Sequence, residues 1–156
     1  MNMLLYVVVI PAVIYLVASA INRRYRVRKN TWPLAIAALL FSSSLFLPSP
    51  IIEGSDTEFW THFFGGGFFI GLLCLYFRPL IKRELAWYQE LILLFMAVSS
   101  FGVVNELYEL FAHQIGIFRE SLDDTSWDLL ANTLGALTFF VGYKLIMRLK
   151  TLFISR

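Results

Sequence analysis

The sequence predicts an all-α fold, a polytopic transmembrane bundle of five helices that forms one domain over residues 1–156. The first observation is composition: 58% of the residues are hydrophobic and 15% are charged, whereas soluble domains average about 45–50% and about 25%. The second is that the apolar residues form five blocks, each reaching the roughly 17–25 residues that a helix needs to cross a bilayer. The third is that the basic residues lie in alternate connections between these blocks.

The five blocks cover residues 3–21, 31–48, 59–77, 89–112 and 128–147. The first is followed, and not preceded, by the basic run NRRYRVRKN, so we expect a membrane helix rather than a signal peptide. Pro48 and Pro50 end the second block. The run Gly65-Gly66-Gly67 lies in the third, where small residues favour close packing between helices.

The basic residues predict the orientation of the bundle. Twelve of the 13 Lys and Arg residues fall in the first loop, the third loop, or the end of the last block and the tail. Short loops rich in Lys and Arg stay in the cytoplasm. We therefore expect the N-terminus outside and the C-terminus inside, with Arg119 the single basic residue on the outer side.

Acidic residues and histidines gather at the opposite end from the bases. Asp and Glu contribute little to membrane topology, so this asymmetry needs a separate cause. Near the outer ends of the predicted spans lie both histidines, His62 and His113, and nine of the eleven acids, namely Glu53, Asp56, Glu58, Glu106, Glu109, Glu120, Asp123, Asp124 and Asp128.

Helical spacing places several of these groups on polar stripes at similar depth. Residues three, four or seven apart lie on one face of a helix, within about 60° of one another. If the stripes face each other, they enclose a pocket rich in carboxylates. The three stripes are Glu58 with His62, then Glu106 with Glu109 and His113, and finally Asp124 with Asp128, Asn132 and Gly135.

A bound divalent cation is one way in which such a pocket would be stabilised. Ionised side chains within a membrane are costly, and clustered carboxylates repel one another unless protons, water or a cation lie among them. A mixture of Asp, Glu and His suits Zn, Mn or Fe, and carboxylates alone suit Mg or Ca. The sequence predicts metal ligands among Glu58, His62, Glu106, Glu109, Asp124 and Asp128, catalytic roles for Glu106, Asp128 and His113, and a ligand-orienting role for Asn132.

Simpler interpretations stand beside these roles. Glu53, Asp56 and Glu120 fit solvated loop charges, and Asp123 or Asp124 fits a helix cap. His113 equally fits an interfacial residue without a specific partner.

Three segments resemble the VanZ-like small membrane proteins and the related YjdF-type inner-membrane proteins. They are Glu58 with His62 in HFFGGG, Glu106 with Glu109 in NELYEL, and Asp128, Asn132 and Gly135 in DDTSWDLLANTLGAL. The resemblance covers residues 56–142, and DTSWD is closer to the YjdF-type pattern. Phe59 stands where VanZ-like chains carry a lysine. The VanZ-like family implies a role at the cell envelope in low-level glycopeptide resistance.

Two classes of function remain open from the sequence. One is a metal-dependent hydrolase or transferase that acts on a lipid or lipid-linked envelope substrate at the outer face of a bacterial inner membrane. The other is a non-enzymatic module that binds or moves a cation, a proton or a cationic envelope ligand. No nucleic-acid partner is expected, because the basic loops fit contacts with anionic lipid head groups.

Overall fold

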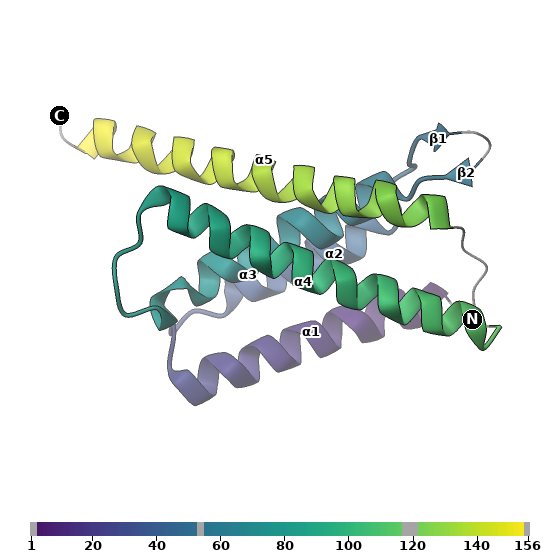
Figure 1. The fold of residues 1–156 in the computed structure, drawn as a ribbon. Helices are drawn as coiled ribbons and strands as arrows, with labels where there is room; N and C mark the ends of the chain where they lie inside the picture. Colours follow the sequence, from purple (N-terminus) through teal and green to yellow (C-terminus); the bar gives the residue numbers. More distant parts are fainter. Residues whose placement is uncertain (1–2, 53–54, 117–121, 155–156) are drawn as a thin grey trace.

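The computed structural model describes residues 3–52, 55–116 and 122–154. Successive crossings of the bundle run in opposite directions. The chain passes along the bundle five times, so the two termini lie at opposite ends (Figure 1). The all-α bundle expected from the sequence is confirmed. Four helices in the described ranges are long and apolar enough to cross a membrane, at Val7–Tyr25, Thr61–Leu80, Trp87–Gln114 and Thr125–Phe153.

The first apolar block forms helix α1, Met3–Tyr25. The second forms a shorter helix than expected, because α2, which packs against α1, spans only Trp32–Ser44. At about 1.5 Å per residue, the 13 residues of α2 cover roughly 20 Å, less than the roughly 30 Å of a hydrocarbon layer. The Ser42 and Ser43 hydroxyls donate hydrogen bonds to carbonyls one turn back, and the helix ends before Pro48.

A small hairpin connects α2 to the third crossing. Strands β1 (Ile51–Ile52) and β2 (Ser55–Asp56) pair antiparallel. The Thr57 hydroxyl and amide both donate to the Pro50 carbonyl, and Thr57 is buried. Glu58 then adopts a positive φ of 45°, which is uncommon for a residue with a side chain. This tight connection fixes where the third crossing begins.

The third crossing starts as a π-helix, η1 (Thr61–Phe68), and continues as α3 (Phe69–Phe77) and a 3₁₀ turn, η2 (Arg78–Leu80). It is followed by α4 (Trp87–Gln114) and α5 (Leu122–Ile154). Helix α5 packs most extensively against η1. A Cβ atom on Gly67 would lie 2.1 Å from the Asn132 carbonyl oxygen, and one on Gly135 would lie 2.1 Å from the Phe63 carbonyl oxygen. The glycines therefore allow direct contact between the two backbones.

The core lies where α2, α3, α4 and α5 meet. It is built from small and aromatic side chains, with Phe69, Ile70, Leu94, Val98 and Phe139 among the buried members. Large apolar side chains also cover the outside of the bundle, including Phe95, Phe101 and Val141. An outer surface of this kind is what hydrocarbon requires and water disfavours.

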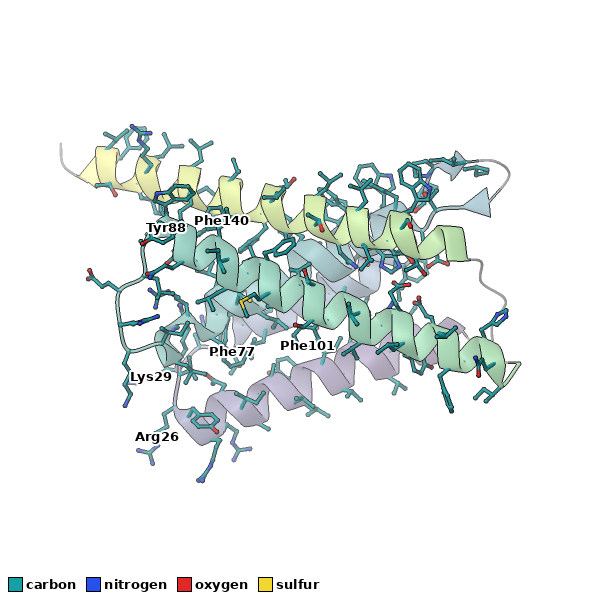
Figure 2. All side chains as sticks on the ribbon, in the orientation of Figure 1. Arg26, Lys29, Phe77, Tyr88, Phe101 and Phe140 are labelled. Carbon is teal, nitrogen blue, oxygen red and sulfur yellow. The ribbon has the colours of Figure 1, made fainter. Side chains whose placement is uncertain are left out.

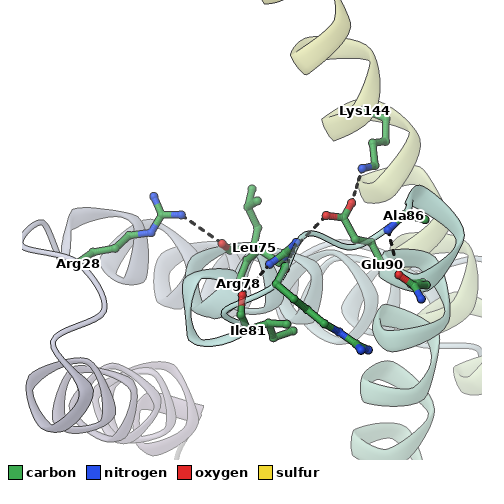
Figure 3. Close-up of polar contacts among 9 residues, drawn as sticks. Arg28, Leu75, Arg78, Ile81, Ala86, Glu90 and Lys144 are labelled. Carbon is green, nitrogen blue, oxygen red and sulfur yellow. Dashed lines mark hydrogen bonds and ion pairs between the residues drawn. The ribbon is translucent and has the colours of Figure 1, made fainter.

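The end of the bundle that carries the basic loops is fastened by ion pairs. Arg26 and Lys29 project from the α1–α2 loop away from the helices (Figure 2). Arg28 donates to the Tyr76 carbonyl at 3.2 Å. Glu90 of α4 lies between Arg78, whose Nε is 3.2 Å from its carboxylate, and Lys144 of α5 (Figure 3). The three crossings η1–α3, α4 and α5 are thus joined through a single carboxylate.

Replacing Glu90 with Gln should lower the stability of the bundle. The amide removes the charge that pairs with both Arg78 and Lys144, and hydrogen bonds to charged groups contribute about 1.5–3 kcal/mol. We expect a lower midpoint of thermal unfolding in detergent. Glu84→Gln, at an exposed position in the preceding loop, is the matched control and should leave the midpoint unchanged. Equal midpoints for the two variants would contradict a stabilising role for Glu90.

Candidate functional site

Three ionisable side chains from three different elements meet near the end of the bundle opposite the basic loops. They are His62 of η1, Glu106 of α4 and Asp128 of α5, and one ligand atom from each lies within 4.8 Å of the other two. The His62 Nε2 and Asp128 Oδ1 atoms are 3.2 Å apart. His62 is 8% exposed, Asp128 is 4% exposed, and Glu106 is half-buried. We call these three residues the His–Glu–Asp cluster.

The glycine run of η1 brings Asp128 to His62. Gly66 faces Asn132 so closely that a Cβ atom would lie 1.6 Å from the Asn132 Oδ1 atom. Gly67 and Gly135 hold the two backbones in contact one further turn into the bundle. The His62 amide donates to the Glu58 carbonyl at 3.2 Å, which continues the helix back to the hairpin. π-helical turns are rare and occur frequently at functional sites.

The side chains of the cluster are of the types that could hold a metal ion or share a proton. Two carboxylates this close repel one another, and burial deprives ionised groups of hydration, unless a proton, water or a cation lies among them. One nitrogen and two oxygen donors suit Zn, Mn or Fe. Ligands bonded at about 2.1 Å lie at most about 4.2 Å apart, so a small movement of the carboxylates would let all three surround one ion.

Asn132 lies one helical turn further into the bundle from Asp128. It is 4% exposed, and its Oδ1 atom has no hydrogen-bond partner within the described residues. Its Nδ2 atom lies beside Gly102 of α4, 3.4 Å from the place a Cβ would take. Buried polar atoms are nearly always hydrogen-bonded to protein or to ordered water. The amide oxygen faces Gly66 of η1, and the amide nitrogen faces Gly102 of α4.

The remaining residues singled out from the sequence lie outside the cluster. Glu109 is half-buried and accepts a hydrogen bond from the Asn105 amide at 2.6 Å. Glu58 is exposed at the start of the third crossing. His113 is exposed near the end of α4, about 10 Å along the helix from Glu106. The side chain of Asp124 lies outside the described part of the chain.

Asn105 was not singled out by sequence reasoning, although its spacing of four residues from Glu109 was an available signal. By contrast, nothing in the sequence indicates a cavity of about 250 Å³ between α4 and α5, which has Asn132 in its wall. The groups that line it are mostly apolar, and apolar residues occur throughout both helices.

A comparison with protein families gives a match, which covers most of these elements. Residues 55–148 match a family described as "Predicted membrane protein (DUF2238)", and this range holds the hairpin's second strand, η1, α3, α4, most of α5 and the whole cluster. Neither the curated proteins nor the solved structures include a match. The family description agrees with the four apolar helices of membrane-spanning length. Because the match covers more than half of the sequence, the chain belongs to the DUF2238 family of predicted integral membrane proteins.

Proposed function

We propose that the His–Glu–Asp cluster is a divalent-metal site and that the protein is a metal-dependent hydrolase or transferase for a lipid or lipid-linked envelope substrate. One observation carries the proposal. His62, Glu106 and Asp128 come from three separate elements, yet their ligand atoms lie within 4.8 Å of one another, with His62 and Asp128 buried and Glu106 half-buried. Ionisable residues inside membrane segments are rare and mark functional sites.

Three protein ligands leave further coordination positions open, as in catalytic metal sites. The bound ion would supply Lewis acidity, either to a water molecule or to a phosphoryl or carbonyl oxygen. In hydrolysis, the water oxygen forms the new bond to phosphorus or carbon, and the bond to the leaving oxygen breaks. A carboxylate of Glu106 or Asp128 takes the water proton and returns it to the leaving oxygen. Asn132 would orient the substrate from below.

The sidedness of the site is part of the proposal. The basic loops favour the cytoplasmic side, and the cluster lies at the other end of the bundle, so we place it at the outer face of a bacterial inner membrane. The resemblance to VanZ-like and YjdF-type proteins favours the same setting at the cell envelope. His113, exposed near the end of α4, is the alternative candidate for the general base and would not hold the ion.

The second candidate is a non-enzymatic module that binds a cation, a proton or a cationic envelope ligand, such as a VanZ-like resistance factor. Exposed Glu58, close in sequence to His62, favours this candidate because it places negative charge outside the cluster. A transport path is less well supported. The buried members of the described core cluster, which include Val98, Ala136 and Phe139, are all apolar and offer no polar side chains for a relay.

Metal content tests the site directly. We expect the purified protein to hold about one divalent ion per chain by elemental analysis, and Glu106→Gln to lose most of it. Glu109→Gln is the matched control, since it removes a carboxylate from the same helix one turn away but outside the cluster. Equal metal content in the two variants, or none in the unchanged protein after incubation with Zn²⁺ or Mn²⁺, would refute the metal site.

Activity then separates the two candidates. Vesicles of total membrane lipid are incubated with the metal-loaded protein, and released phosphate and fatty acid are measured. Release that falls to background in Glu106→Gln supports the enzyme, whereas bound metal without release supports the binding module.

A further inference from the structure

The cavity between α4 and α5 begins directly beneath the His–Glu–Asp cluster. Leu129, which follows Asp128, and Val103, one turn from Glu106, line its upper part together with Asn132. From there it continues past Ser99 to Phe95, a distance of about 12 Å along α4. The two helices lie next to one another along this stretch (Figure 1). Asn132 therefore belongs to both the surroundings of the cluster and the wall of the cavity.

The cavity opens outward from the bundle. Val98, 3% exposed, forms its floor, while Phe95 and Val103 at its edges are 54% and 49% exposed. Phe95 is the ninth residue of α4, and therefore lies about 12 Å from the start of that helix. An opening at this depth in two membrane-spanning helices faces hydrocarbon and not water.

The lining of the cavity suits a hydrocarbon chain. Its wall is almost wholly apolar, and the Thr133 hydroxyl is already used in a hydrogen bond to the Leu129 carbonyl at 2.8 Å. Its volume of about 250 Å³ exceeds the roughly 150 Å³ of an apolar cavity that takes up benzene. An apolar space in contact with bilayer is filled by lipid chains, because water gains no hydrogen bonds there.

We propose that the α4–α5 cavity binds a hydrocarbon chain of a membrane lipid whose polar head group lies at the His–Glu–Asp cluster. This rests on the proposed function and narrows its substrate class to chain-bearing lipids that enter sideways from the bilayer. A soluble peptide or sugar would approach from the aqueous face and leave the cavity unused. The Asn132 side-chain amide, at the boundary of the two regions, would form a hydrogen bond with the head group or with water beside it.

Photolabelling with a lipid probe tests the inference. The full-length protein is placed in bilayer nanodiscs that contain phosphatidylglycerol with a diazirine in the middle of one acyl chain. After irradiation, labelled peptides are quantified by mass spectrometry. We expect label to concentrate on the α4 and α5 peptides that hold Phe95, Ser99 and Leu129. Label spread evenly over outward-facing residues such as Val13 of α1 or Val141 would overturn the inference.

Paired substitutions sharpen the test. Ser99→Leu fills the cavity, whereas Ser100→Leu makes the same change at the adjacent, exposed position that does not line it. We expect labelling of the α4 and α5 peptides to fall at least five-fold in Ser99→Leu and to stay unchanged in Ser100→Leu. Ser99→Ala, which enlarges the cavity without adding bulk, should keep the labelling. Equal labelling of the two leucine variants would contradict the inference.

Metal content of the same samples separates the two proposals. If Ser99→Leu keeps its metal and loses the label, both stand. Localised label in a protein without metal refutes the metal site and leaves the chain-binding cavity. Metal without localised label refutes the binding of a lipid chain in the cavity and leaves the metal site.

Discussion

Replacing Gly135 with alanine is expected to separate α5 from η1 and to cause a large loss of stability for the addition of a single methyl group. The added Cβ would lie 2.1 Å from the Phe63 carbonyl oxygen and 3.2 Å from the Gly67 Cα atom. Both are backbone atoms of a packed helix and cannot move aside like the end of a flexible side chain. We expect the free energy of unfolding to fall by more than the typical cost of over-packing, which is about 1–3 kcal/mol.

Gly142→Ala is the matched control for this change. Gly142 lies on the same helix, two turns further along, and nothing lies within 4 Å of the place its Cβ would take. Alanine there should stabilise α5 by up to about 1 kcal/mol, because glycine is the weaker helix former. Thermal unfolding in detergent, followed by far-UV circular dichroism, measures the stability of both variants. Similar midpoints for the two variants would show that the close backbone contact does not stabilise the fold.

Adding Zn²⁺ or Mn²⁺ should raise the midpoint of thermal unfolding of the unchanged protein, and Asp128→Asn should remove most of the rise. A ligand that binds only the folded state stabilises it by about 2.7 kcal/mol at 100 times its Kd. The neutral amide of the variant removes a charged ligand next to His62. If the Kd rises 100-fold, the stabilisation at the same metal concentration falls to about 0.4 kcal/mol.

Two controls distinguish the loss of metal binding from a loss of stability caused by the substitution itself. Glu109→Gln keeps the three cluster residues and should show the full rise, and a chelator should reverse it. The unfolding midpoint of Asp128→Asn without metal reports any structural cost of the substitution itself. A rise of equal size in Asp128→Asn and in the unchanged protein would exclude Asp128 as a ligand.

Much of the fold follows from the positions and lengths of the apolar blocks, and its departures have local causes. The third and fourth blocks, expected at 59–77 and 89–112, correspond to a crossing that reaches Phe77 and to α4 at Trp87–Gln114. The fifth was expected to end at 147, yet α5 continues to Ile154. Lys144, Arg148 and Lys150 mark where a helix leaves hydrocarbon, but good helix formers do not end the helix itself.

The candidate site could be predicted only in part. Spacing of three residues places Glu106 and Glu109 about 60° apart on one helix, and periodicity alone cannot decide which of the two faces His62. That choice depends on how η1 and α5 approach, which in turn depends on a π-helical stretch and on backbone contact at Gly67 and Gly135. Neither has a period that a sequence window detects. The cavity beneath depends on the same approach.

The origin of the His–Glu–Asp cluster in three separate crossings has a consequence for biogenesis. Membrane helices insert individually and associate laterally afterwards. His62, Glu106 and Asp128 lie on η1, α4 and α5. A nascent chain in which only one or two of these segments have been inserted therefore lacks part of the cluster. The cluster therefore forms only after the three segments have inserted and have packed against one another.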